Sequence, residues 1–338
     1  MRKYQCLGDQ IFKNGAFTLL PIRNEDQYEI LTIRNEQLYH LRQSKPLTKE
    51  AQENYFATVI SDLFEQEFPN QLLFSFFENE TFIGYGGLVH INWIDKNAEI
   101  SFVMKTALEK DFFTKYWSNY LKLIETVAFE ALNFHKIFTY AFDLRPHLYP
   151  VLNSCGFMEE ARLKEHCFFD GHFFDVVYHA KHNRKITLRK AHENDVMLYF
   201  EWTNDQSVRE NSYHSEPVIL ENHQRWFLSK IKDANCFMVV FENHVGAPIG
   251  QVRIQKQDNN TAVIGISNDA NHRGKGYASN MIQMASDAFL AENPEILISA
   301  FIKTENKASE KAFQKAGYIL DVVLDYESHP SYHYIKTL

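Results

Sequence analysis

Two glycines and two cations stand together at the start of a helical pattern. Arg273, Gly274, Lys275 and Gly276 precede residues 277–291, where apolar side chains recur at helical spacing. Glycine lets the backbone take positive φ or approach a ligand closely. A helix start offers unpaired N–H donors and a partial positive charge, and arginine can bind phosphate oxygens through two hydrogen bonds. The stretch therefore predicts a binding site for a diphosphate.

Two common nucleotide-binding motifs do not fit this stretch. A Walker loop needs Ser or Thr directly after Lys275, where the chain has Gly276. A dinucleotide-binding fingerprint needs a third glycine at the position of Ser279, inside a parallel βαβ unit. Taken alone, the stretch could also be a glycine-rich turn that carries surface cations by chance.

A second motif, ENKASEKAFQKAGY, follows at residues 305–318. Asn306 can cap a short helix there, and Ser309 follows at helical spacing. Strand patterns at 261–268 and 296–302 precede the helical pattern and the second motif. In this order the segments resemble the GCN5-related N-acetyltransferases (GNAT), whose signature is a strand, an R-G-x-G-x-A loop with its helix, a further strand, and N-x-x-S/A before a closing G-F/Y.

The resemblance covers residues 186–338 and implies acetyl-CoA as co-substrate, with no metal. It implies that the amides of residues 273–278 bind the pyrophosphate and that the strand at 266–268 hydrogen-bonds the pantetheine arm. Asn306 and Ser309 would line the far side of the coenzyme. The acetyl-CoA-binding residues implied in this way are Ile266, Ser267, Asn268, Arg273, Gly274, Lys275, Gly276, Tyr277, Ala278, Asn306, Ser309 and Phe313.

Two positions depart from the family pattern. Asn271 stands where many members have Gln or Arg, which is tolerable in a loop that works through backbone donors. Phe313 stands where many members place a tyrosine as general acid, and a phenyl ring cannot protonate the departing thiolate. Another group or water must supply that proton, or the thiolate must leave unaided.

In this family the segment between the first two helices shapes the acceptor site, here residues 203–223. A neutral amine would attack the thioester directly, and a base matters more for amines of high pKa. The candidates are Asp205 and Arg209 for substrate binding, and Tyr213, His214 and Glu216 for catalysis. An ordinary surface position is an equally good interpretation of each.

A finer resemblance concerns the acceptor. Residues 201–227 and 248–254 resemble acetyltransferases of nucleotide-linked amino sugars in nonulosonic acid (pseudaminic-type) pathways, whereas the tail at 159–179 also resembles relatives that acetylate ribosomal-protein N-termini. We expect a small primary amine as acceptor, that of a sugar nucleotide. Two alternatives stay open: an acetyltransferase of protein or peptide N-termini, and a non-catalytic regulator that binds acetyl-CoA.

The chain repeats its pattern once. Asn35 matches Asn204 in one aligned segment, and Gly84 matches Gly250 in the next. Matches that keep their order over such a span predict a duplicated domain. The predicted boundaries are residues 1–180 for the first copy, 180–185 for a polar linker and 186–338 for the second copy.

The first copy lacks the glycine loop. It reads KTALEKDFFTKYWS at 105–118, without glycine, and the bulky Phe112 and Phe113 would obstruct a phosphate. Prolines interrupt its counterpart of the second motif. We expect this copy to be catalytically degenerate, with a modified mode of acetyl-CoA binding as the alternative.

The patterns of the second copy follow the order β-α-α-β-β-β-α-β-α-β-β. This predicts an α/β (α+β) fold with two tandem GNAT-like domains, each a mixed, mostly antiparallel sheet flanked by helices. Asp170 and Gly171, between alternating aromatic residues, predict a type I′ hairpin. Asp258, Asn259 and Asn260 predict another turn.

Composition narrows the class of protein. The 338 residues are 45% hydrophobic, with a net charge of −8, which disfavours nucleic acid as a partner. The four cysteines form no CxxC pair, and the histidines lack zinc-ligand spacing. No window has transmembrane length, and no signal peptide is evident. We expect a cytoplasmic enzyme with no metal and no membrane partner, which could form a homodimer.

Overall fold

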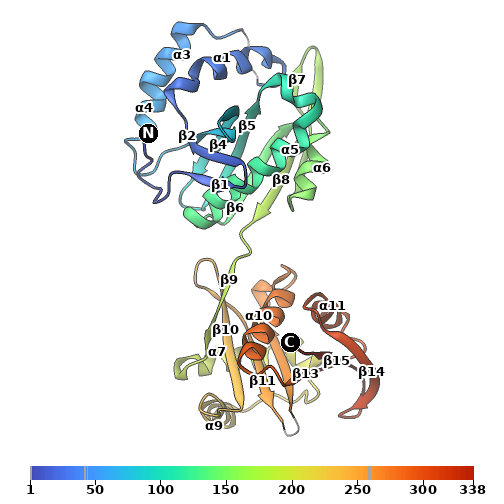
Figure 1. Cartoon of the computed structure of the whole chain (residues 1–338). Coiled ribbons are helices and arrows are strands. Elements are labelled where there is room, and N and C mark those ends of the chain that lie inside the picture. Colours follow the sequence, from blue (N-terminus) through green and yellow to red (C-terminus); the bar gives the residue numbers. More distant parts are fainter. Residues whose placement is uncertain (1, 42, 44, 258–259) are drawn as a thin grey trace. The chain divides into compact units, whose positions relative to one another are not determined.

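The chain divides into two compact units, Met1–Asn183 and Arg184–Leu338, coloured blue to green and yellow to red in Figure 1. The computed structural model describes residues 2–41, 43, 45–257 and 260–338. The turn predicted at Asp258 and Asn259 therefore lies outside the described residues. Each unit has its own sheet and its own hydrophobic core, which confirms the predicted fold class.

The first unit contains an eight-stranded sheet in the order β1-β2-β3-β4-β5-β6-β8-β7. Its strands are β1 (Phe12–Asn14), β2 (Phe17–Pro21), β3 (Leu72–Glu78), β4 (Thr81–Asn92), β5 (Asn97–Met104), β6 (Lys136–Phe142), β7 (Met158–Phe169) and β8 (His172–His182). Its helices are η1 (Asn24–Asp26), α1 (Gln27–Glu36), α2 (Leu38–Leu41), α3 (Lys49–Tyr55), η2 (Phe56–Ile60), α4 (Ser61–Leu63), α5 (Thr106–Glu125), η3 (Thr126–Ala131) and α6 (Leu148–Ser154).

The second unit contains a seven-stranded sheet in the order β14-β15-β13-β12-β11-β10-β9. Its strands are β9 (Ile186–Lys190), β10 (Cys236–Asn243), β11 (Pro248–Lys256), β12 (Thr261–Asn268), β13 (Leu297–Lys303), β14 (Ile319–Tyr326) and β15 (His329–Lys336). Its helices are η4 (Glu193–Asp195), α7 (Val196–Asn204), α8 (Gln206–Asn211), α9 (Leu220–Lys230), η5 (Ala270–His272), α10 (Tyr277–Glu292) and α11 (Lys307–Lys315).

Helices cover both faces of the second sheet. On one face α10 and α11 pack in a core that includes Ile264 of β12 and Ile298 of β13, and Figure 1 shows α10 lying across the strands. On the other face α7 and α9 pack against Val240 of β10. We call these the α10 face and the α7 face. Because side chains alternate along a strand, neighbours of core residues in β12 and β13 belong to the α7 face.

In each sheet, the parallel pair of described strands separates after three residues. β12 pairs with β13 only through residues 261–263 and 297–299, although both strands continue beyond them. β5 and β6 likewise pair only through residues 97–99 and 136–138. The opening between β12 and β13 is called the strand wedge below. It leaves backbone donors and acceptors without a neighbouring strand, which is unusual inside a sheet.

Matching side-chain contacts confirm the predicted duplication. The Asn35 side chain accepts a hydrogen bond from the Leu47 N–H (2.8 Å) and donates one to the Leu47 carbonyl (3.0 Å). Asn204 makes the same two bonds with Val218, at 2.8 and 3.0 Å. In both units this amide therefore fixes the end of the segment that follows the first helix.

The same steric restriction explains why both matched positions, 84 and 250, are glycine. A Cβ atom on Gly84 would lie 2.3 Å from the Val103 carbonyl oxygen, and one on Gly250 would lie 2.5 Å from that of Ser267. Both distances are far below van der Waals contact. The neighbouring strand therefore excludes any side chain at both positions.

Two local predictions had different outcomes. The type I′ turn is confirmed, because Asp170 (φ 46°) and Gly171 (φ 85°) both have positive φ. The linker prediction was partly wrong, because β8 continues to His182 and pairs it with Lys136. Cross-strand pairing extends the strand through residues whose polar composition suggested a loop.

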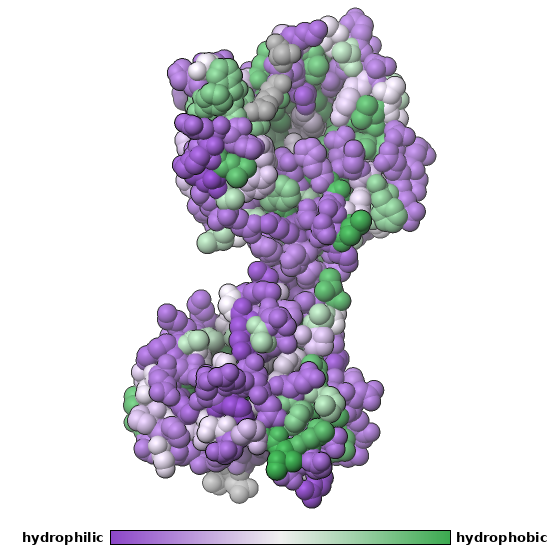
Figure 2. Space-filling view, turned by 180° about the vertical axis from the view of Figure 1, so that it is seen from behind, coloured by the Kyte–Doolittle hydropathy of each residue, from purple (hydrophilic) through white to green (hydrophobic). Residues whose placement is uncertain are grey.

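Figure 2 shows hydrophilic side chains over most of the face that it displays, with hydrophobic ones in smaller patches. None of the described helices is long and apolar enough to cross a membrane. In the part of the chain that the structure describes, no group of three or more His, Cys, Asp or Glu side chains could hold a metal ion.

Candidate functional site

The strand wedge presents backbone groups of β12 toward β13. The Asp269 N–H donates to the Ile249 carbonyl of β11 (2.9 Å), and the Asn260 carbonyl accepts from the Leu297 N–H of β13 (3.0 Å). Backbone direction alternates along a strand, so Ile264, Ile266 and Asn268 direct their backbone groups into the wedge. A ligand with amide groups could pair there as an added strand would.

The predicted diphosphate loop lies directly beyond the open end of the wedge. Gly274 (φ 72°) and Gly276 (φ 81°) both take the left-handed conformation, and a Cβ atom on either would meet nothing within 4 Å. Gly276 is the N-cap of α10, and no side chain caps this helix. The first amides of a 16-residue helix are therefore open to a ligand.

An ion pair between an arginine of the loop and the aspartate that caps α8 holds the loop in place. The Arg273 guanidinium pairs with the Asp205 carboxylate (2.6 Å) and donates to the Asn268 carbonyl (3.2 Å). Burial would raise the pKa of the Asp205 carboxyl, but hydrogen bonds from Arg273 and the Val208 amide outweigh it, so the pKa is lowered. Asp205 thus holds the loop, and Lys275, which is exposed, is the cation left to meet an incoming anion.

Asp269 supports the loop from the other side. Its carboxylate accepts hydrogen bonds from the Asn271 amide (2.9 Å), from His272 Nδ1 (2.8 Å) and from Trp202 Nε1 (3.3 Å). Burial would raise the pKa of Asp269, but these donors together lower it. The remaining predicted loop residues begin α10, where Tyr277 is buried and Ala278 is half-buried.

The second motif forms the opposite wall. Asn306 caps α11 by accepting from the Ser309 N–H (3.0 Å), as predicted. Phe313 is buried and packs edge-on against Tyr318, with ring centroids 5.0 Å apart. The Tyr318 hydroxyl is bonded to Ser286 Oγ (2.8 Å), and burial holds its pKa well above the ordinary value. Neither ring offers an acidic proton at this wall.

Residues 203–223, called the acceptor segment below, are held on the α7 face by an arginine of the segment itself. Arg209 donates from Nη1 to the carbonyls of His214 (3.0 Å) and Glu216 (3.3 Å), and burial lowers its pKa. The side chains of His214 and Glu216 are exposed. Arg209 therefore shapes the segment through backbone contacts, and the two predicted proton-transfer groups lie at its surface.

Tyr213 alone of the predicted catalytic residues points onto the sheet. Its hydroxyl bonds to Ser331 Oγ of β15 (2.9 Å), and its ring contacts Tyr326 (centroids 4.9 Å) and His329 (5.7 Å). Its neighbour Lys303 is 7% exposed and donates from Nζ to the Glu210 carbonyl (3.1 Å). The segment and the β14–β15 hairpin thus enclose one side of the wedge.

Sequence reasoning missed three side chains on this face of β13, namely Ser299, Phe301 and Lys303. The Phe301 ring is stacked between Tyr326 (3.9 Å, 7°) and His333 (4.7 Å, 11°). The alternation in LISAFIK was a usable signal, because it puts a serine, an aromatic ring and a lysine on the face opposite the core.

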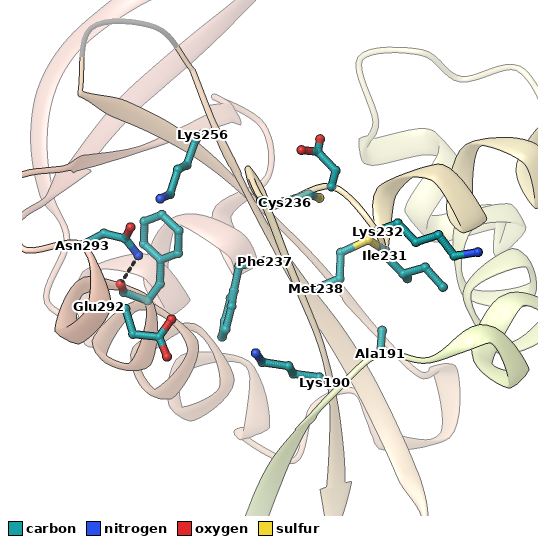
Figure 3. A pocket seen from close by; sticks show the side chains of 13 residues that line it. Lys190, Ala191, Ile231, Lys232, Cys236, Phe237, Met238, Lys256, Glu292 and Asn293 are labelled. Atoms are coloured by element: carbon teal, nitrogen blue, oxygen red, sulfur yellow. Dashed lines mark hydrogen bonds between the residues drawn. The ribbon is translucent and has the colours of Figure 1, made fainter.

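A separate hollow of about 320 Å³ lies elsewhere in the unit. Figure 3 shows its lining, with Phe237 of β10 between Lys190 and the end of α10 at Glu292, and Met238 beside Ile231. The glycine loop is at the other end of α10, roughly 24 Å away at 1.5 Å per residue. The hollow therefore contains no part of the candidate site.

The first unit closes the equivalent region. β5 ends at Met104 and α5 begins at Thr106, so no loop separates them. Gln37 Nε2 donates to the Met104 carbonyl (2.7 Å), and Arg145 pairs with Glu109 of α5 (3.2 Å). No phosphate-binding loop is formed here.

The predicted obstruction by Phe112 and Phe113 has a different form. Both belong to α5 and not to a loop, with Phe112 exposed and Phe113 buried against the His147 ring (centroids 4.4 Å). The helix itself replaces the loop, because it starts so soon after β5.

The matched asparagines offer a test of which unit carries the site. Asn204→Ala removes two hydrogen bonds that hold the acceptor segment, worth roughly 1–3 kcal/mol together. We expect kcat/KM for the amine to fall about tenfold, with the acetyl-CoA KM unchanged, in steady-state assays. Asn35→Ala removes the equivalent two bonds from the first unit, and a third from Gln43 Nε2 (3.1 Å), and should leave both constants near wild type. Equal losses in the two variants would contradict this assignment.

Both units of the chain are similar in sequence to known proteins. Two family models described as "Acetyltransferase (GNAT) domain" match the chain, one at residues 19–178 and the other at 185–319. Spermidine N(1)-acetyltransferase of Vibrio cholerae serotype O1 is 30% identical over 94 residues, 28% of this chain and 53% of that protein. The chain thus spans about half the length of this relative.

Solved structures of similar fold include two coenzyme complexes. The spermidine N-acetyltransferase from Vibrio cholerae with CoA and spermine is 22% identical, with a TM-score of 0.43 over 50% of this chain and 96% of that one. Aminoglycoside acetyltransferase AAC(6')-Ib with coenzyme A is 19% identical, with a TM-score of 0.39 over 45% and 95%.

Proposed function

Because the chain belongs to the GNAT acetyltransferase family and carries two such domains in tandem, we propose that its second unit transfers an acetyl group from acetyl-CoA to a primary amine of a nucleotide-linked amino sugar. The observation that carries this proposal is the uncapped N-terminus of α10 behind Gly274 and Gly276, placed at the mouth of the strand wedge. Acetyl-CoA would supply the activated thioester.

The residues present fit such a coenzyme. The α10 amides and Lys275 suit a diphosphate, and the open space beside both glycines leaves room for it. The backbone of Ile264 and Ile266 suits the two amides of a pantetheine arm, because both would otherwise lack partners inside the sheet. Asn306 and Ser309 would border the arm from α11.

The chain's own groups then determine the chemistry. The wedge would hold the thioester beside the α7 face, where the acceptor segment and the β14–β15 hairpin bring the amine. Holding both reactants in one geometry converts a bimolecular reaction into an effectively unimolecular one. Because Phe313 has no hydroxyl, we propose that water protonates the departing thiolate.

The positive charges near the expected position of the acceptor favour an amine substrate that also carries anionic groups. Lys303 and Arg209 are both held by backbone carbonyls, and within the described residues neither forms an ion pair with a carboxylate. A polycation such as a polyamine would be repelled by them, whereas the phosphates of a sugar nucleotide would be attracted. The half-buried rings of Phe301 and Tyr326, which stack on each other, add an apolar border on this side.

The first unit would not bind acetyl-CoA. Without a glycine loop, and with Gln37 on the Met104 carbonyl, it lacks the features that carry the proposal for the second. We assign it a supporting role in the same polypeptide. The cysteines are free thiols, so we propose a reducing compartment, the cytoplasm, as the site of the reaction.

The experiment is an acetyl-transfer panel with the full chain. Release of the CoA thiol would be followed with UDP-linked amino sugars, free amino sugars, spermidine and N-terminal peptides, and products identified by mass spectrometry. Acetylation confined to the sugar nucleotides is the expected result. Acetylation of peptides or spermidine instead would reassign the acceptor, and acetyl-CoA binding without transfer to any amine would indicate a regulator.

A further inference from the structure

Three polar side chains form a chain of hydrogen bonds on the α7 face. Ser299 Oγ of β13 lies 2.9 Å from His333 Nε2 of β15, and His333 Nδ1 lies 3.0 Å from the Asp321 carboxylate of β14. Since a carboxylate only accepts, Nδ1 carries the proton and Nε2 accepts from the serine hydroxyl. The arrangement directs a basic nitrogen at one serine oxygen.

The serine stands at the closed end of the strand wedge. It is opposite Val263, the last residue of β12 that pairs with β13. Gly265, the next residue of β12 on the same face, would meet nothing within 4 Å if it had a Cβ atom. Ser299 itself is 7% exposed. An open space therefore adjoins an otherwise enclosed hydroxyl.

The site proposed above places the reacting atoms near this hydroxyl. With the diphosphate at the glycine loop, the thioester at the other end of the coenzyme arm would reach the closed end of the wedge. The acceptor amine would arrive from the α7 face, past Tyr213 and Lys303. Ser299 is on that face, at that end.

We infer that Ser299, His333 and Asp321 form the proton relay that activates the acceptor amine, an inference that rests on the proposed acetyltransferase function. The bound ammonium group passes a proton to Ser299 Oγ while the serine passes its own to His333 Nε2. The Asp321 carboxylate stabilises the resulting imidazolium, as carboxylates do in related histidine arrangements.

The remaining steps balance the protons. The freed amine attacks the thioester carbon, the C–N bond forms, and the C–S bond breaks. The second amine proton reaches the departing thiolate through water, and His333 returns its proton to solvent through Ser299 when the product leaves. Ser299 contacts the amine, whereas His333 and Asp321 act through it.

Other titratable side chains on this face of the sheet are kept apart from His333. Lys303, Tyr213, Tyr326 and His329 lie on the same face, separated from it by the Phe301 ring or by Ser331. Asp321 is the one carboxylate in contact with His333 among the described residues. The pH response of the relay is therefore attributed to this histidine–carboxylate pair.

The test compares pH profiles of Ser299→Ala and His333→Gln with wild type. At pH 7 we expect kcat/KM for the amine to fall about 100-fold in both, the usual size of general-base effects. The pKa of an α-amine is roughly 7.7–8.0. Below that pH, kcat/KM of the variants should therefore rise with the unprotonated fraction of the amine, by about tenfold per pH unit. The deficit should narrow at pH 9, and acetyl-CoA affinity should not change.

Controls keep the outcomes distinct. His90→Gln removes another histidine bonded to a carboxylate, Glu99 at 2.8 Å in the first unit, and should leave the profile unchanged. Asp321→Asn, which keeps the shape, should give a smaller loss with the same pH response. A thermal unfolding curve like that of wild type would show that the variants fold.

Two results would overturn the relay alone. In the first, Ser299→Ala and His333→Gln keep the kcat/KM and the pH profile of a wild-type protein that acetylates its amine. The other is an acetyl group trapped on Ser299 during turnover, which would make the serine a nucleophile. A wild-type protein that acetylates no amine would instead overturn the proposed function, and the relay with it.

Discussion

Replacing Gly276 by tryptophan is expected to lower acetyl-CoA affinity by at least about 100-fold. The position is open, with nothing within 4 Å of a Cβ atom, so the indole would occupy the space in front of the α10 amides. Displacing a diphosphate from several charge-assisted hydrogen bonds, each worth about 1.5–3 kcal/mol, accounts for a loss of this size. Isothermal titration calorimetry on the full chain measures it.

The same unit contains a matched control. Gly246, in the β10–β11 turn, has φ 79° against 81° for Gly276, and it too has open space around it. Gly246→Trp therefore carries the same backbone penalty, about 1–2 kcal/mol for a left-handed conformation, without touching the loop. It should bind acetyl-CoA like wild type. An affinity that survives Gly276→Trp would show that the loop is not the diphosphate site.

Lys303→Met should have the next largest effect, confined to anionic acceptors. The lysine is enclosed beside the Tyr213 ring, and among the described residues a backbone carbonyl is the one hydrogen-bond partner of its ammonium. Loss of a hydrogen bond to a charged group, about 1.5–3 kcal/mol, predicts that kcat/KM for a nucleotide-linked amine falls roughly 10- to 150-fold. Steady-state assays with the same amine, with and without its nucleotide, would separate the charge effect from packing.

Lys336→Met is the matched control for Lys303. Lys336 is also largely buried and donates to a backbone carbonyl, that of Ala316 (3.2 Å), but it pairs with Asp287 near the end of α10. Its loss should leave kcat/KM for both acceptors unchanged. Equal effects of Lys303→Met on the charged and uncharged acceptors would argue against a phosphate contact.

Much of the fold followed from local signals. The glycine loop, the helix behind it and the Asn306 cap depend on residues close in sequence, and so did the Asp170-Gly171 hairpin. The duplication was visible because Asn35 and Asn204 have one shared task, and selection for that task preserves the residue type. Local backbone chemistry of this kind is readable without a structure.

The acceptor side was harder to predict because it depends on pairing between distant strands. Ser299 and His333 are neighbours only through the register of β13 with β15, and Asp321 joins them through an irregular pairing of β14. Polar residues of the connecting segment drew attention to His214 and Glu216, which are exposed. A sequence pattern shows which face a side chain takes, but not which strands lie beside it.

Charge pairing within the protein also escaped prediction. The sequence predicts Arg273 as a phosphate ligand and Asp205 as a substrate contact, yet the two side chains lie 2.6 Å apart and brace the loop together. They are far apart in the sequence and meet because α7, which ends directly before Asp205, packs against β12. Their predicted ligand roles stay predictions, and Lys275 is the loop cation that the structure leaves exposed.

The stoichiometry of acetyl-CoA binding tests the central claim most directly. The claim is that one of two related domains in this chain forms the coenzyme site, because only the second has the glycine loop at its strand wedge. Calorimetric titration of the full chain should give one site per chain, and none for Gly276→Trp. Two sites per wild-type chain, or one site that persists in Gly276→Trp, would contradict the account.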